Sequence, residues 1–338
     1  MAVNTPLKQN TLSDWAYLAV EKHFHKSIKH EVDVIEDKDP EALHQMRVGM
    51  RRLRTAVTGF APALDLPKEA QEKNIGKIAR TLGELRDLDV LQEALKNDYQ
   101  PALPKSEQAA IETALDYLTT QRQKAYKKVK STLEKSPYQD FKQAVQSWLK
   151  NPTYRLMGQI PIVAVLPDLL LPQISNLLLH PAWLVGTQSE AGEIYTLDEL
   201  SKKDIEKELS IHGENLHKLR KQTKRVRYQM ELFADFYGST YAAYLKDMKA
   251  VQEVLGQIQD SVVLAEFLAK ATGSGSNSLP PKFAKKLAQN RYEAWQKWQI
   301  LQKRYLNTSI RQSFRSELLR PKTVTNNGFD SKNGVKSY

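Results

Sequence analysis

The chain contains no cysteine, which excludes disulfide bonds and thiolate-bound metal sites and is typical of a reducing compartment. Long apolar runs are also scarce. The most apolar stretch, residues 160–171, is short and contains Pro161, Pro167 and Asp168, so we predict that it does not cross a bilayer. The first 14 residues lack the apolar core of a signal peptide. These absences together predict a cytoplasmic protein that has no membrane partner.

Sequence motifs of catalysis and metal binding are missing as well. The chain has no Walker-type phosphate loop, no Gly-x-Ser-x-Gly, no His-Glu-x-x-His and no alternating cluster of acids for divalent metals. His23 and His25 are two positions apart and therefore point to different faces of a helix. We expect a protein that is not an enzyme, uses no cofactor and binds no metal.

Strand signals are weak, whereas apolar residues recur at helical spacing over long segments, which predicts an all-α fold. Helices are expected over residues 12–36, 40–60, 68–96, 106–135, 138–150, 201–236, 241–270 and 282–309. Asp39 and Pro40 are suited to the N-cap and first turn of the second of these helices. The segment 151–196 differs, because it has five prolines and few charges, and only a short helix over 169–179 is expected there.

The length of 338 residues favours two compact units. We predict an N-terminal helical half over 8–150, a proline-rich connection over 151–196, a C-terminal helical half over 197–310 and a disordered tail over 321–338. Each half supplies about four long helices, the number in an up-and-down bundle. The predicted fold is two antiparallel four-helix bundles.

The two halves resemble each other at an offset of 173 residues. Between positions 43 and 95, 16 of 53 residues are identical to the residue 173 further on. The glycines Gly83 and Gly256 match at this offset, and we expect each to permit a close approach of two helices. We infer an internal duplication and two pseudo-symmetric half-domains, since the period is far longer than a solenoid repeat.

The positive charge of the chain is concentrated in the duplicated segments. Residues 44–54 hold four basic residues and residues 217–228 hold six, and neither segment contains an acid. These ten charges account for nearly all of the formal net charge of +11. Such a concentration indicates a polyanionic partner.

On a helix the basic residues of each segment share one face, within about 80° of each other. The first face contains His44, Arg47, Arg51 and Arg54, and the second contains His217, Arg220, Lys224 and Arg227, with Lys221 and Tyr228 on its flank. Arg52 and Arg225 point to a neighbouring face. Guanidinium groups bind phosphate oxygens bidentately, and lysines add mobile charges, so the two faces could line one polyanion site. The alternative is a salt-bridged surface with acids such as Asp87 and Asp260, and it is favoured for Arg52 and Arg225.

Further lysines match at the same offset, and they could extend the basic surface. Lys124 matches Lys297, and Lys130 matches Lys303. Runs of this kind more often form solvated helix faces.

The motif His44-x-x-Arg47-Val48-x-x-Arg51-Arg52-Leu53-Arg54, followed by Leu82-Gly83-x-x-Arg86-Asp87-x-Asp89-Val90-Leu91, resembles the CHAD domain, the conserved histidine α-helical domain. The segment from Leu216 to Glu231 also resembles the latter half of that domain, and the resemblance covers about residues 8–310. It implies two four-helix bundles around a basic central pore that binds inorganic polyphosphate, often at polyphosphate granules. The implied ligands are His44, Arg47, Arg51, Arg54, His217, Arg220, Lys221, Lys224 and Arg227.

Other polyanions remain possible partners. Inorganic polyphosphate and other phosphate or sulfate anions fit the basic faces best. Nucleic acid is less favoured, because Tyr228 is the one aromatic residue on these faces that could stack with a base. A third hypothesis is an accessory partner of a polyphosphate-metabolising enzyme. The sequence identifies no protein partner.

Overall fold

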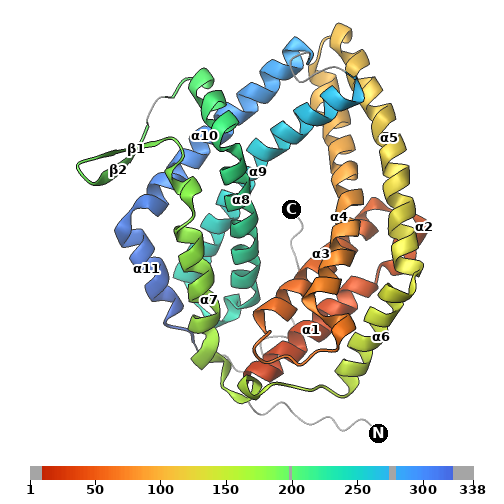
Figure 1. The fold of residues 1–338 in the computed structure, drawn as a ribbon, viewed down its shortest axis with the longest axis vertical. Helices are drawn as coiled ribbons and strands as arrows, with labels where there is room; N and C mark the ends of the chain where they lie inside the picture. Colours follow the sequence, from red (N-terminus) through yellow and green to blue (C-terminus); the bar gives the residue numbers. More distant parts are fainter. Residues whose placement is uncertain (1–9, 198–199, 274–278, 323–338) are drawn as a thin grey trace.

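The computed structural model describes residues 10–197, 200–273 and 279–322, and most of these residues are helical (Figure 1). The prediction of an all-α fold is confirmed. The N-terminal half contains α1 (Leu12–Ile28), α2 (Glu31–Glu36), α3 (Pro40–Gly59), α4 (Glu72–Ala94), α5 (Lys105–Glu134) and α6 (Ser136–Lys150). The later part contains α7 (Ile162–Leu178), α8 (Lys202–Leu232), α9 (Ser239–Ala271), α10 (Pro281–Leu306) and α11 (Thr308–Leu318).

The two basic segments lie on α3 and α8, and both helices begin with side-chain caps. Asp39 accepts a hydrogen bond from the backbone N–H of Glu41 at 2.8 Å, and Pro40 occupies the first turn of α3, as predicted. Ser201 and Asp204 form a reciprocal capping box at the start of α8. These caps define where each helix starts and therefore which face its basic residues occupy.

Several sequence-based helix boundaries were wrong. The helix expected over 12–36 is divided into α1 and α2, and Asp37, whose φ of 51° is left-handed, follows the last residue of α2. In the connection, α7 starts at Ile162 and continues through Pro167 and Pro172, so the short helix expected over 169–179 is longer and begins earlier. Neighbouring elements pack against α7 and stabilise it despite the prolines.

The connection also contains a short antiparallel hairpin that the sequence did not predict, formed by β1 (Thr187–Glu190) and β2 (Glu193–Thr196). Ala191 and Gly192 both have positive φ, at 51° and 85°, as a two-residue hairpin turn requires. The strands are mostly exposed on both faces, so they lack the apolar alternation that identifies a half-buried strand. The predicted disordered tail lies outside the described residues from position 323 onward.

One described stretch, residues 162–184, is long and apolar enough by length and composition to cross a membrane. It is longer than the stretch over 160–171 that the sequence pattern marks as most apolar. In the folded protein 39% of the apolar 18-residue window within this stretch is buried. Leu166, Ile174 and Leu177 of α7 belong to the core. The helix therefore supplies core contacts, as an internal helix of a folded domain does.

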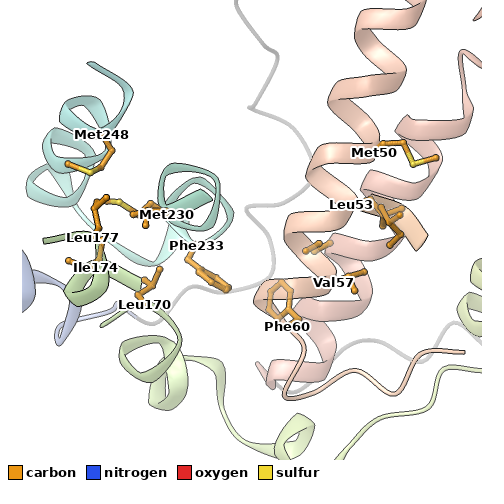
Figure 2. Close-up of a cluster of buried hydrophobic side chains, with 14 of the residues drawn as sticks. Met50, Leu53, Val57, Phe60, Leu170, Ile174, Leu177, Met230, Phe233 and Met248 are labelled. Atoms are coloured by element: carbon orange, nitrogen blue, oxygen red, sulfur yellow. The ribbon is translucent and has the colours of Figure 1, made fainter. Parts of the chain in front are cut away.

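Buried apolar side chains join the two halves at both ends of the molecule. At one end a large cluster contains side chains of α3, α7, α8 and α9, and Figure 2 shows Phe60 and Phe233 at the ends of α3 and α8. Their rings meet edge to face at 5.3 Å, and Trp15 meets Phe236 at 4.7 Å. At the other end a second cluster includes Leu95 and Leu103 from the N-terminal half, with Leu264, Leu268, Phe283 and Leu287 from the C-terminal half.

In Figure 1 the N-terminal helices, red to yellow, lie on one side of the molecule, and the green to blue helices lie on the other. The apolar clusters fix α3 and α4 of the first group relative to α8 and α9 of the second. The division into domains at 8–150, 151–196 and 197–310 stays a prediction, and the buried core is continuous across it.

Candidate anion-binding site

A pocket of about 910 Å³ lies between α3 and α4 on one side and α8 on the other. Its described lining includes the basic residues Arg47, Arg51, Arg54, Arg80, Arg155, Lys221, Lys224 and Arg225. Glu72 is the one acid among the described lining residues. Eight basic residues and one acid give this wall a formal charge of +7.

The arrangement follows from the amphipathic pattern of α3 and α8. On α3 the residues Leu43, Met46, Met50, Leu53 and Val57 are buried in the core. On α8 the corresponding buried residues are Leu216, Leu219, Thr223, Val226 and Met230. Because a helix that buries one face exposes the opposite one, the basic residues are directed away from these cores. The two helices pack against each other near their C-terminal ends, which brings the basic faces together.

Arg47 and Arg220 occupy equivalent places at the offset of 173 residues. Arg47 pairs with Asp87 at 3.2 Å, and Arg220 pairs with Asp260 at 3.8 Å. A Cβ placed on Gly83 would lie 3.4 Å from Nε of Arg47, and one on Gly256 would lie 3.3 Å from Nε of Arg220. Each glycine therefore makes room for an arginine side chain of the neighbouring helix, and α3 packs on α4 as α8 packs on α9.

Two further arginines of the basic faces also have carboxylate partners. Arg54 pairs with Glu72 of α4. Arg227 donates to Glu231 at 2.6 Å and to the side-chain oxygen of Gln252 at 3.0 Å. The salt-bridge alternative considered for the basic faces therefore holds for four of the predicted ligands, Arg47, Arg54, Arg220 and Arg227.

Arg51 and Lys224 differ from these residues, because neither forms an ion pair with a carboxylate of the described residues. The Arg51 guanidinium lies 4.4 Å from the centroid of the Tyr228 ring, and the Arg227 guanidinium lies 4.3 Å from the same centroid. Nε of Arg51 is buried and makes no hydrogen bond to the described residues. An unpaired buried donor costs roughly 1–3 kcal/mol, which an anionic ligand would offset.

Lys224 is the most perturbed of the predicted ligands. Burial, together with the charges of Arg47 and Arg51 across the pocket, lowers the pKa of Lys224 to about 8. Burial is also the main cause of the lowered pKa of Arg51. Both shifts come first from burial and then from neighbouring cations, which share a partly buried space with few anions. The pocket is thus electrostatically prepared for negative charge.

The two histidines lie near the pocket without lining it. His44 and His217 are half-buried on α3 and α8. Burial is the main cause of the lowered pKa of both imidazoles; Glu41 partly opposes it at His44, whereas the charge of Lys221 adds to it at His217. Both histidines are therefore neutral near pH 7 in the absence of a ligand.

The residues that the sequence suggested as secondary contacts divide into those that line the pocket and those that do not. Arg225 and Tyr228 line the pocket, and Arg225 has no carboxylate partner among the described residues, so the salt-bridged interpretation favoured for it is not realised there. Arg52 lies outside the pocket near α1, where its charge contributes, after burial, to the lowered pKa of Lys26. Lys124 lines a separate pocket of about 400 Å³ between α5 and α9. The remaining lysines, Lys130, Lys297 and Lys303, line neither pocket.

Sequence reasoning missed Arg80 and Arg155. Arg80 lies on α4 outside the two basic segments, and Arg155 lies in the connection, where its backbone N–H donates to the backbone oxygen of Ala63 at 2.9 Å. Neither has an ion-pair partner among the described residues. Only their place in the fold brings them to the pocket, since neither belongs to a duplicated motif. Within the described part of the chain, no group of three or more His, Cys, Asp or Glu residues could hold a metal ion.

Comparisons with known proteins identify relatives of the whole fold. The family model of the CHAD domain matches residues 18–269. The crystal structure of the CHAD domain from the plant Ricinus communis is similar with a TM-score of 0.56 and 23% identity, covering 92% of this chain and 94% of that one. PptA from Streptomyces chartreusis has a TM-score of 0.54 and 15% identity, covering 89% of this chain and 99% of that one. No curated protein matches the sequence. At these identities the two structures establish a shared fold.

Proposed function

Because the chain belongs to the CHAD domain family, we propose that it binds inorganic polyphosphate in the pocket between α3 and α8. The observation that carries this proposal is the pair Arg51 and Lys224, which face one pocket from different helices without carboxylate partners among the described residues. Each link of a polyphosphate chain carries a negative charge, so successive links can neutralise successive cations of the wall.

The residues in and beside the pocket would play different roles in this binding. Arg51 offers an unpaired guanidinium that Tyr228 orients, and Lys224 offers an ammonium group close to other cations. Lys221 and Arg225 are exposed on the same stretch of α8 and would contact the chain where it enters from solvent. Arg47 and Arg54, which are paired with Asp87 and Glu72, would exchange a carboxylate for a phosphate. The histidines would act beside the pocket by gaining a proton near bound phosphate.

We also propose that the fold arose by duplication, with the pocket as a basic pore at the pseudo-symmetry axis. Two features support this origin. The Arg47, Gly83 and Asp87 arrangement recurs as Arg220, Gly256 and Asp260, each displaced by 173 positions. Phe60 and Phe233, displaced by the same number, contact each other, as equivalent residues do at a twofold axis.

The protein is proposed to be a binding module and not an enzyme, present in the cytoplasm and at polyphosphate granules. Nucleic acid is the weaker candidate, because the one aromatic ring of the pocket, among the described lining residues, is Tyr228, whose ring is already covered by Arg51 and Arg227. No described contact favours an accessory role with an enzyme over simple binding.

The test is a polyphosphate titration of two matched double variants. Arg51→Met with Lys224→Met removes two charges from the pocket, whereas Lys105→Met with Lys203→Met removes two exposed charges from outside it. We expect the first pair to weaken binding by at least about 100-fold, since hydrogen bonds to charged groups contribute about 1.5–3 kcal/mol each. The second pair should change affinity by less than about threefold. Equal losses would show diffuse charge attraction, and displacement by single-stranded DNA at equal phosphate concentration would favour nucleic acid.

A further inference from the structure

The pocket has a second kind of wall that an inorganic chain would not use. Its described lining includes the apolar residues Val57, Ala61, Leu64, Leu66 and Ala79. They come from the end of α3, the loop that follows it and α4, next to Arg54 and Arg80. A fully ionised phosphate chain gains nothing from contact with aliphatic groups, because its oxygens need donors or water. This wall therefore fits a ligand that has an organic part.

Polar groups suited to an uncharged ring system border the apolar wall. The side-chain amides of Gln71, Gln173 and Gln229 line the pocket and make no hydrogen bond to another described residue. Each amide offers both a donor and an acceptor, the combination with which proteins read the edge of a nucleobase. The guanidinium groups of Arg80 and Arg155 have no carboxylate partner among the described residues, and such planes stack on bases.

We propose that the pocket binds a nucleoside polyphosphate, with its base on the apolar and amide wall and its phosphates on Arg51 and Lys224. This inference rests on the proposed function, because the phosphate groups use the same cations as the inorganic chain. The volume of about 910 Å³ lies within the range of pockets that enclose small organic ligands. The ring of Tyr228 is covered by two arginines, so aliphatic side chains and arginine planes hold the base.

The experiment compares ATP with inorganic tripolyphosphate by calorimetry on the full chain. Both ligands have three phosphates, and ATP carries less negative charge because one end is esterified. Electrostatics alone therefore predicts weaker binding of ATP. Base contacts predict that ATP binds at least about fivefold more tightly, which is the effect of one net hydrogen bond of about 1 kcal/mol between the base and an amide of the wall.

A matched pair of variants locates the preference. Ala61→Gln with Ala79→Gln fills the apolar wall without changing its charge, and Ala109→Gln with Ala243→Gln makes the same change at exposed helical positions outside the pocket. The first pair should remove the preference for ATP and leave the affinity for tripolyphosphate within about twofold. The second pair should behave as the unmodified chain.

The outcomes separate this inference from the proposed function. Binding of tripolyphosphate with no preference for ATP would overturn the inference and leave the proposed function standing. A preference for ATP that survives filling of the wall would also overturn it, since the base would then lie elsewhere. If neither ligand binds, both the inference and the proposed function are wrong.

Discussion

The lowered pKa of Lys224 predicts that polyphosphate binding weakens as pH rises above about 8. In the free protein the pKa of Lys224 is about 8, because the ammonium is buried and faces Arg47, Arg51 and Arg220, with Asp87 opposing their effect. A bound chain adds negative charge beside the ammonium and raises its pKa toward the ordinary value of about 10.4. Binding above pH 8 therefore takes up a proton, and affinity falls with increasing pH.

The size of the effect follows from the linkage between protonation and binding. At about pH 7 roughly nine in ten free molecules carry a charged Lys224, and at about pH 9 roughly one in ten do. If Lys224 stays charged in the complex, the affinity should fall by about tenfold between these pH values. Proton uptake should approach one per bound chain at about pH 9.

Calorimetry in two buffers of different ionisation enthalpy measures both affinity and proton uptake. The control is Lys224→Arg, which keeps the positive charge at each pH because arginine has a pKa above about 12. Titration of the ligand itself is the same for both proteins and cancels in the comparison. An unchanged pH dependence in the Lys224→Arg variant would refute the reasoning, because the effect would then come from another group.

Three further predictions follow from the described contacts. The double variant Asp87→Asn with Asp260→Asn releases Arg47 and Arg220 from their ion pairs. It should raise the affinity for polyphosphate several-fold in a fluorescence titration. A loss of affinity would show instead that the carboxylates position the arginines. In Arg51→Met with Lys224→Met, the slope of log affinity against log salt should become shallower by about 1.4, and an unchanged slope would place both groups away from phosphate. Phe233→Ala should destabilise the fold by about 3–5 kcal/mol in urea unfolding, and a loss under about 1 kcal/mol would contradict the packing at the junction of α3 and α8.

Sequence patterns predicted the helices best where capping and periodicity agreed. Asp39 and Pro40 defined the start of α3, and the apolar spacing of α3 and α8 placed their basic residues on one face. The hairpin of residues 187–196 escaped prediction because its exposed strands show no alternation. The start of α7 was missed because Pro167 usually ends a helix, whereas tertiary packing holds this one together.

The sequence predicted several basic residues of the candidate site, and it did not predict which of them form ion pairs with carboxylates. The offset of 173 residues identified Arg51 and Lys224 as equivalent positions, and the structure places both in one pocket. The pattern did not reveal which cations would be neutralised, since the pairing of Arg54 with Glu72 depends on how α3 packs against α4. Arg155 was invisible to motif analysis, because the fold of the connection alone brings it there.

The most direct test of the central claim is a crystal structure of the protein with a short inorganic polyphosphate. We expect phosphate groups between α3 and α8, within hydrogen-bond distance of the Arg51 guanidinium and the Lys224 ammonium, with Lys221 or Arg225 on the next link. A chain bound only to lysines on the outer surface, while the pocket between α3 and α8 holds none of its phosphates, would contradict the account.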